Sequence, residues 1–76
     1  MELNEFVAHF AEQFEDTDAS VFTPETNFRE IEEWSSLLAL SIIAMISEEY
    51  DIAIKGVEMK AANTIQELFD IVKAKQ

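Results

Sequence analysis

Two adjacent serines, Ser35 and Ser36, offer the clearest site for chemistry in this chain, and they follow Trp34 in the segment EEWSSLLALSIIAMISEEYDI. An apolar run at helical spacing follows the pair, so a helix should begin here. Serine is a preferred N-cap because its side-chain oxygen accepts a hydrogen bond from a free backbone N–H group, and Trp34 can pack back as a hydrophobic staple. A cap needs only one serine, so if Ser35 caps the helix, Ser36 keeps a free hydroxyl in the first turn.

Few other side chains in the sequence are reactive. The chain has no cysteine, which excludes a disulfide, a thiolate metal site and a thiol nucleophile. The single histidine, His9, lies near the apolar stripe of a predicted helix, where a structural role is commoner than a catalytic one. The segment DTD at 16–18 lacks the other ligands of a calcium loop, and no glycine-rich phosphate loop or metal-ligand spacing occurs. We therefore predict no catalytic residue and no metal site.

The chain is short and strongly acidic. Its 76 residues predict one domain, residues 1–76, with a small core, and they carry a formal net charge of −11. Residues 1–50 hold twelve acidic residues against one base, Arg29, whereas residues 51–76 hold four of each. Such a field repels nucleic acid and anionic membranes and attracts basic proteins. We expect a monomer with neither nucleic acid nor membrane as a partner.

The expected location of the protein is the cytoplasm. No segment is apolar over the length that a membrane span needs, and the first residues, MELNEFVAHF, carry acids without the basic start of a signal peptide. The absence of cysteine also suits a reducing compartment.

The distribution of breakers and apolar residues predicts an all-α fold. One glycine and one proline leave the sequence as helices joined by polar segments. The predicted helices cover residues 3–15, 36–50 and 56–61 and most of ANTIQELFDIVKAK, where Thr64 and Glu67 form a capping box. The expected fold is a small irregular four-helix bundle with three longer helices and one short helix. The long connection over residues 16–35 should be anchored on the core by Val21, Phe22, Phe28 and Ile31.

The predicted second helix is apolar on more than one face. When its residues are placed at 100° steps, the expected core face holds Ala39, Ile42, Ile43, Ile46 and Tyr50. Four short helices cannot bury every side of one member, so apolar residues off this face are candidates for a contact surface, although single exposed leucines are common. The candidate partner-facing residues are Leu37, Leu38, Ser41, Met45 and Glu48.

The segment SSLLALSIIAMISEEYDIAI resembles the phosphopantetheine attachment region of acyl carrier proteins. That family has an acidic residue, the attachment serine and a leucine, and these open a second helix that ends in acidic residues, an aromatic residue and Asp-Ile. Ser36 and Leu37 match the serine and the leucine. The resemblance covers the whole chain, including TPETNF in the connection and NTIQELFDIV in the last helix. The tryptophan before the serines, Trp34, resembles the variant of this motif found in stand-alone carriers of specialised pathways. Further matches are Ile42, Ile46, Glu48, Glu49, Tyr50, Asp51 and Ile54.

The resemblance implies a non-catalytic carrier with an acyl-carrier-protein-like bundle. Ser36 would receive a covalent 4′-phosphopantetheine arm from coenzyme A, with Ser35 as the less favoured attachment residue. The arm would hold acyl or related intermediates as thioesters for enzymes of fatty-acid, polyketide or related biosynthesis. The implied partners are a phosphopantetheinyl transferase and acyl-loading and synthase enzymes with basic docking surfaces.

The chain departs from the family pattern at three positions. Ser35 replaces the usual acidic residue before the attachment serine, and Leu38 and Ser41 replace acidic residues of the first turns. These changes remove charge where carriers meet basic partners, and they favour a carrier for substrates other than those of the main fatty-acid carrier.

Two other classes of function stay open from the sequence. One is a small acidic helical adaptor that binds a basic partner without a prosthetic group, for which Ser35 in place of the acidic residue is the best argument. The other is an acidic cation-binding or nucleic-acid-mimicking protein. That class needs its acids arrayed on one surface, whereas here they are scattered among ordinary helix faces.

Overall fold

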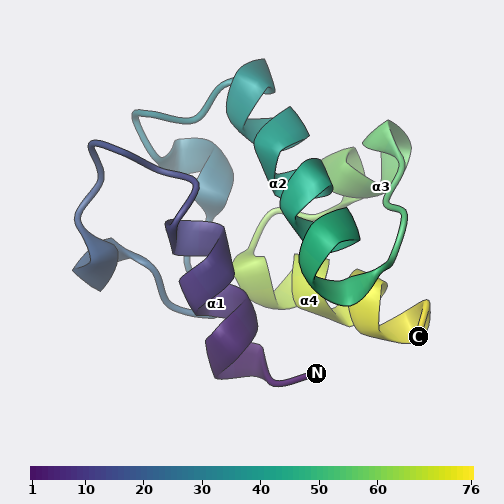
Figure 1. Ribbon diagram of the computed structural model, residues 1–76. Helices are drawn as coiled ribbons and strands as arrows, with labels where there is room; N and C mark the ends of the chain where they lie inside the picture. The colour runs from purple at the N-terminus through teal and green to yellow at the C-terminus, as the bar shows by residue number, and fades with distance from the viewer.

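The computed structural model describes residues 1–76 as four α-helices joined by one long and two short connections (Figure 1). The all-α bundle with three longer helices and one short helix is confirmed, and no helix is both long and apolar enough to cross a membrane. The α-helices are α1 (Leu3–Ala11), α2 (Ser36–Tyr50), α3 (Gly56–Ala61) and α4 (Ile65–Ala74), and two 3₁₀ helices, η1 (Ala19–Val21) and η2 (Phe28–Glu30), lie between α1 and α2.

The core is one cluster of seventeen buried residues, all of them apolar. Phe6 and Phe10 face it from α1 at a spacing of four residues, which places both on one side of the helix. The ring of Phe6 meets the ring of Phe69 of α4 edge-on, with 5.5 Å between their centroids. Ile42 and Ile46 of α2 complete the centre of the bundle and are fully buried.

The first helix is shorter than the sequence predicts. It ends at Ala11 and not at residue 15, because the N–H groups of Gln13 and Phe14 donate to carbonyls only three residues back, at 3.2 and 3.0 Å. Phe14 still packs in the core, where its ring lies 4.9 Å from that of Phe22 in the connection. Phe22 lies outside the helical pattern of residues 3–15, so this pattern alone does not predict the contact.

The long connection is fixed on the core and on the start of α4. Phe22 and Phe28 are buried as predicted and Ile31 is half-buried, but Val21 is exposed, so its predicted anchoring role is wrong. The backbone of the connection pairs with α4 through an isolated bridge between Asn27 and Thr64. The connection is thus an ordered wall of the bundle that leads directly into α2.

The other helix ends follow local signals in the sequence. In α4 the Thr64 hydroxyl accepts from the Glu67 N–H at 3.1 Å and Glu67 Oε1 accepts from the Thr64 N–H at 3.1 Å, so the predicted capping box is confirmed. Helix α2 ends at Tyr50 because Asp51 adopts a left-handed conformation, with φ 56° and ψ 40°. Aspartate tolerates this region better than most residues because its short side chain can hydrogen-bond locally.

Candidate functional site

The start of α2 separates the two serines by function. Ser35 is the N-cap, and its side-chain oxygen accepts from the N–H of Leu38 at 3.2 Å. Ser36 is the first helical residue; it is exposed, and its hydroxyl has no hydrogen-bond partner in the chain. In Figure 1 this first turn stands at the opposite end of the bundle from the N-terminus. Both serines are exposed, and the hydroxyl of Ser36 is the one that makes no hydrogen bond within the chain.

Trp34 fixes how the chain enters α2. Its ring packs against Phe28 of η2, with 4.8 Å between ring centroids, and lies at 6.3 Å from Phe14. The tryptophan is therefore part of the aromatic cluster of the connection, which holds the residue before the cap. This anchoring, together with the Ser35 cap, places Ser36 on a rigid element.

The buried face of α2 differs from the predicted one. Leu38 and Met45 are 9% and 5% exposed, so the prediction that they lie on a partner-facing surface is wrong. Leu38, Ile42, Met45 and Ile46 follow the spacing of a single helix stripe, and this stripe belongs to the core cluster. The residues on the other side of the predicted core face, Ala39, Ile43 and Tyr50, are only half-buried.

The remaining candidate contact residues lie at the surface of α2. Leu37 is 72% exposed, Glu48 is exposed and Ser41 is half-buried. Two exposed apolar residues were not among the sequence candidates: Leu40 at 63% and Val57 of α3 at 73%. The sequence could have indicated Leu40 as a further contact residue, because it lies three residues after Leu37 and residues at this spacing are neighbours on a helix surface.

A groove of about 530 Å³ opens beside Ser36, between the first turns of α2 and helix α3. Ala39 and Ile43 line its α2 wall, and Met59 and Lys60 line its α3 wall. Arg29 of η2 also lines the groove, and its Nη2 and Nε donate to the carbonyls of Met59 and Ala62 at 2.8 and 3.1 Å. The α2 wall of the groove is thus apolar, whereas its α3 wall combines an apolar side chain with a lysine and is held by Arg29.

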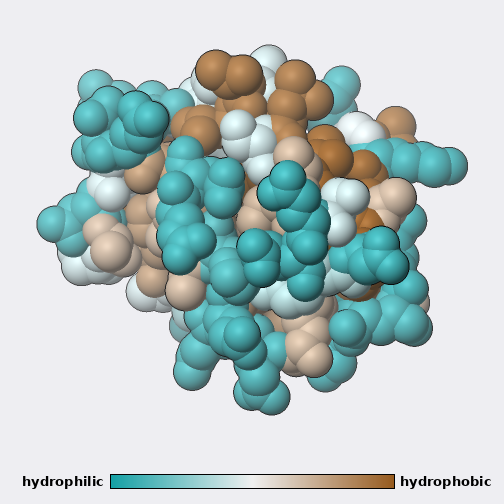
Figure 2. Space-filling model, in the orientation of Figure 1, coloured by the Kyte–Doolittle hydropathy of each residue, from teal (hydrophilic) through white to brown (hydrophobic).

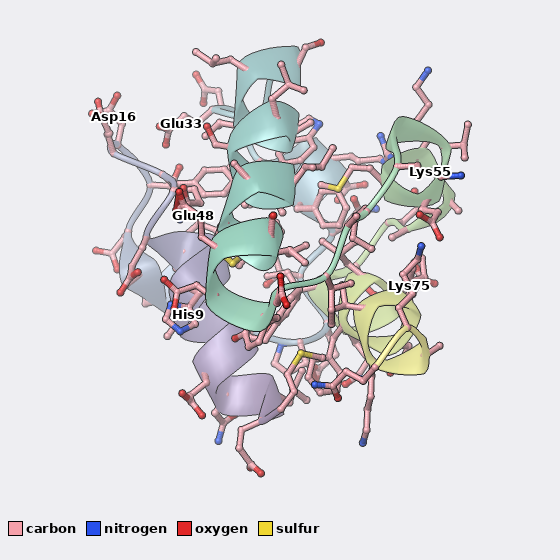
Figure 3. The ribbon with its side chains drawn as sticks, turned by 45° about the vertical axis from the view of Figure 1, so that its right-hand side comes forward. His9, Asp16, Glu33, Glu48, Lys55 and Lys75 are labelled. Carbon is pink, nitrogen blue, oxygen red and sulfur yellow. The ribbon has the colours of Figure 1, made fainter.

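Helix α3 is also held from the side of α4. The Lys75 ammonium lies 2.8 Å from the Glu58 carboxylate and donates to the carbonyl of Ala53 at 3.3 Å. The hydrogen bond from Lys75, followed by that from the Lys55 N–H, lowers the pKa of Glu58. Figure 3 places Lys55 and Lys75 on one side of α2 and Asp16, Glu33, Glu48 and His9 on the other. The labelled lysines and the labelled acidic residues thus lie on opposite sides of α2 in this view.

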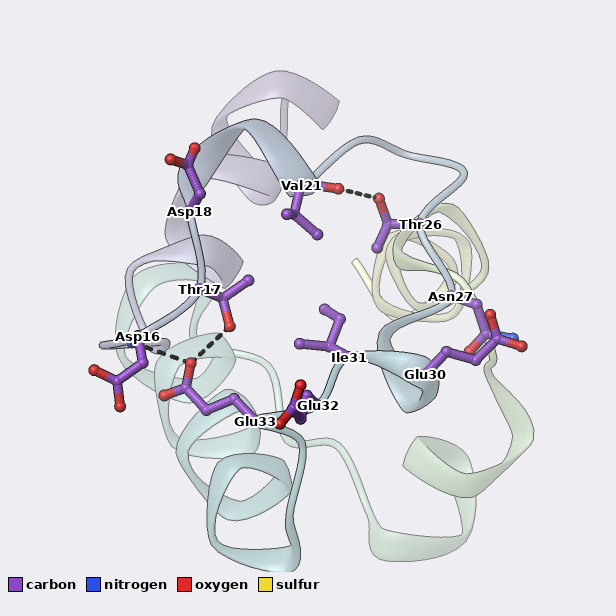
Figure 4. Close-up of a pocket in the computed structure, with 10 residues that line it drawn as sticks. All are labelled: Asp16, Thr17, Asp18, Val21, Thr26, Asn27, Glu30, Ile31, Glu32 and Glu33. Carbon is purple, nitrogen blue, oxygen red and sulfur yellow. Dashed lines mark hydrogen bonds between the residues drawn. The ribbon is translucent and has the colours of Figure 1, made fainter.

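A larger hollow of about 780 Å³ lies within the long connection, and Ser36 does not line it (Figure 4). Acidic residues surround it, and Glu33 accepts from the Thr17 hydroxyl at 2.7 Å and from the N–H groups of Glu15 and Asp16 at 3.0 and 3.1 Å. These hydrogen bonds, above all the bond from Thr17, lower the pKa of Glu33. Glu33 therefore holds the turn that follows α1 in place. No group of three or more His, Cys, Asp or Glu residues is arranged so that it could hold a metal ion.

His9 lies against the end of α2, away from the groove. Its Nε2 is 3.8 Å from Glu49 and its Nδ1 is 3.6 Å from Glu12, while its ring meets Tyr50 edge-on at 5.9 Å. Burial, together with the charges of Glu5 and Glu49, raises the pKa of Tyr50. These contacts link α1 to α2, which agrees with the structural role predicted for His9.

The first turn of α2 suits a covalently attached phosphate ester. Ser36 presents an unbonded hydroxyl at the N-terminus of a helix of fifteen residues, where free N–H groups and the helix dipole favour negative charge. The groove beside it gives a flexible chain attached at Ser36 an apolar surface to lie on. The residues present thus fit the 4′-phosphopantetheine arm that the sequence resemblance implies.

Comparison with known proteins gives one match. The family described as phosphopantetheine attachment site matches residues 4–72, which include both serines, the groove and most of α4. No curated protein and no solved structure matches the chain. Domains of this family carry a covalently attached 4′-phosphopantetheine and work with phosphopantetheinyl transferases and synthase enzymes. Because the match covers nearly the whole chain, this protein belongs to the phosphopantetheine attachment-site family and is a carrier, not an enzyme.

Proposed function

We propose that this chain carries its phosphopantetheine arm on the side-chain oxygen of Ser36. The observation that carries the proposal is that Ser35 caps the helix whereas the Ser36 hydroxyl makes no hydrogen bond. The Ser35 oxygen accepts a hydrogen bond from the Leu38 N–H. If this oxygen moved away to react, the Leu38 N–H would lose its hydrogen-bond partner at the helix start. The exposed Ser36 hydroxyl makes no such bond and can be covered by the active site of another enzyme.

The proposed attachment step uses the hydroxyl of Ser36. A transferase withdraws the proton of Ser36, whose oxygen attacks the phosphorus that bears pantetheine in coenzyme A. The new bond joins that oxygen to phosphorus, the phosphoanhydride bond breaks, and adenosine 3′,5′-bisphosphate leaves with the electron pair. The resulting phosphodiester anion lies at a helix N-terminus, which favours it by about 0.3–1 kcal/mol.

The attached arm supplies the thiol that this cysteine-free chain lacks, and acyl groups are held on it as thioesters. We propose that these groups belong to a specialised fatty-acid, polyketide or related pathway, not to the main fatty-acid pathway. Support comes from Ser35 and Ser41, which stand where the family usually has acidic residues, and from Trp34. A monomeric state and a cytoplasmic location stay predictions of the sequence.

Two exposed residues of α2, Leu37 and Glu48, and the half-buried Ser41 are the proposed contacts with partner enzymes. Leu37 stands next to Ser36, Ser41 lies about one turn further on, and Glu48 is the first acidic residue of the helix. Contacts of this size suit a carrier that visits several enzymes in turn, since small interfaces are transient. Leu38 and Met45 belong to the core and are not part of this proposal.

Intact mass after incubation with coenzyme A and a broad-specificity phosphopantetheinyl transferase tests the proposal. The parent chain and the Ser35→Ala variant should each gain one phosphopantetheine group, and Ser36→Ala should gain none. A gain in Ser36→Ala that disappears in Ser35→Ala would move the attachment to Ser35. No gain in any chain with several transferases would instead favour the acidic adaptor, in which both serines serve only the helix start.

A further inference from the structure

The surface of α2 beside Ser36 carries no charge, although the chain as a whole has a net charge of −11. Residues 36–47 contain no acidic residue, no basic residue and no histidine. The first charged residue of α2 is Glu48, which lies about 18 Å further along the helix axis at a rise of 1.5 Å per residue. A partner that reaches Ser36 therefore meets an uncharged stretch of helix.

Apolar side chains cover this uncharged surface. The chain exposes four large apolar residues, and three of them, Leu37, Leu40 and Val57, lie at the start of α2 or on α3. We call these three residues the apolar collar. Figure 2 shows apolar surface gathered over this end of the molecule, above a face that is mostly hydrophilic. The fourth residue, Val21, lies in η1.

The residues of the apolar collar line the groove beside Ser36 or directly follow residues that line it. Leu40, Ser36 and Gly56 line the same groove, Leu37 follows Ser36, and Val57 follows Gly56. An enzyme that covers Ser36 and this groove would also contact Leu40, which lines the groove. Burial of exposed leucine and valine side chains is favourable at roughly 25 cal/mol per Å² of apolar surface.

The carboxylates nearest in sequence to the collar are engaged or directed elsewhere. Glu30, Glu32 and Glu33 line the hollow of the long connection (Figure 4), and the Glu58 carboxylate is paired with Lys75 at 2.8 Å. The exposed side chain of Lys60 lines the groove beside Ser36. A basic enzyme surface would thus find a lysine and apolar groups where carriers of this family usually offer acids.

We propose that the transferase that loads Ser36 docks on the apolar collar with an uncharged, apolar surface around its active-site entrance, and not with a basic surface. The inference rests on Ser36 being the attachment residue and replaces the basic docking surface that the sequence resemblance implies. A second copy of the chain fits the collar less well, because two chains of −11 repel each other and three side chains offer much less area than a stable dimer buries.

The test measures kcat/KM for loading by a broad-specificity phosphopantetheinyl transferase at low and high salt, about 0.05 and 0.5 M. Salt screens exposed charges strongly over this range. The parent value should change by less than about threefold, because steering by charge contributes little. Leu40→Asp and Val57→Asp should each lower kcat/KM by about tenfold or more, mainly through KM, since a carboxylate must be desolvated against an apolar surface. Val21→Asp is the matched control and should keep the parent value.

Further variants and measurements separate the possible outcomes. Leu40→Gln should lose part of the activity, and parent-like loading by this variant would overturn the apolar contact. Circular dichroism of each variant should match the parent, because all three substituted side chains are exposed.

Measurements on the parent chain distinguish the remaining outcomes. If the parent kcat/KM falls more than about tenfold with salt and the collar variants load like the parent, the inference is overturned but Ser36 stays the attachment residue. A parent that never gains mass overturns the proposed function itself. If the parent sediments as a dimer and Leu40→Asp sediments as a monomer, the collar serves self-association, and the inference is also overturned.

Discussion

The side-chain oxygen of Ser35 accepts a hydrogen bond from the backbone N–H of Leu38 at 3.2 Å, whereas the hydroxyl of the neighbouring Ser36 makes no hydrogen bond within the chain. Two chemically identical residues thus have different roles because they are one position apart at a helix start. Ser35 caps the helix, and Ser36, the first helical residue, is exposed and is the residue proposed for modification.

Substitution of the two serines should therefore affect stability to different extents. Ser35→Ala should lower the free energy of unfolding by about 1 kcal/mol, because a helix donor loses its partner. Ser36→Ala should change it by less than about 0.5 kcal/mol, because the hydroxyl makes no bond and alanine is a good helix former. Urea denaturation of both apo variants measures the difference. Equal losses in the two variants would contradict the assignment of the cap.

Ser35→Asp tests whether the missing acidic residue decides the choice of transferase. Aspartate caps a helix as well as serine does, so the free energy of unfolding should stay within about 0.5 kcal/mol of the parent. The added carboxylate should raise kcat/KM with a transferase that has a basic docking surface, and the gain should shrink at high salt. Ser35→Asn, which also caps but carries no charge, is the control. An equal gain in Ser35→Asn would show that charge is not the cause.

Leu37 and Leu38 are adjacent in the sequence but should respond very differently to truncation. Leu38→Ala should lower the free energy of unfolding by about 2–4 kcal/mol, because it removes a buried side chain and leaves a cavity. Leu37→Ala should change it by less than about 0.5 kcal/mol, because this side chain is 72% exposed. Thermal or urea unfolding of both variants measures the contrast, and a large loss in Leu37→Ala would contradict the observed core face.

Arg29 should be needed to hold the α3 wall of the groove. Arg29→Gln removes the guanidinium that donates to the carbonyls of Met59 and Ala62, at an expected loss of about 1–3 kcal/mol. Amide hydrogen exchange in α3 should accelerate more than exchange in α1 or α4. Lys60→Gln removes the same charge and is the matched control, because Lys60 is exposed on α3 and its side chain makes no hydrogen bond. Uniform acceleration in all helices would instead mean that Arg29 stabilises the bundle as a whole.

Stability should decline in acid, and Glu67 should contribute to the decline. Hydrogen bonds from the N–H groups of Asn63 and Thr64 lower the pKa of Glu67 below its usual 4.5. The folded-state pKa is thus below the unfolded value, so the stabilisation is complete above pH 4.5 and is lost as the pH falls through the folded-state pKa. Glu33 and Glu58 contribute in the same direction, since their pKa values are also lowered.

Urea denaturation at a series of pH values checks this prediction. Glu67→Gln can still accept the capping hydrogen bonds but cannot titrate, so its loss of stability below pH 4.5 should be smaller than that of the parent. Glu25→Gln changes an exposed side chain that makes no hydrogen bond and provides the control for net charge. An acid limb in Glu67→Gln as steep as that of the parent would exclude this carboxylate as a cause.

Local signals in the sequence determined much of this protein. The bounds of α2 and α3 follow from caps and breakers, and the capping box of α4 uses residues only three apart, so no distant contact is needed to recognise them. The absence of cysteine and of metal-ligand spacing removed whole classes of chemistry. The order of residues around Ser36 indicated the family, and the family match over residues 4–72 agrees with it.

The tertiary structure alone decided which side of α2 is buried. This helix is apolar almost all round, so its pattern does not select one face, and the packing of the rest of the chain placed Leu38 and Met45 inside and left Leu37 and Leu40 outside. The early end of α1 has a similar origin, since the ring of Phe14 packs against Phe22 of the connection. The hydrogen bonds of Arg29 reach carbonyls at least thirty residues away. Contacts between distant segments depend on how the whole chain packs, and periodicity within one segment carries no information about them.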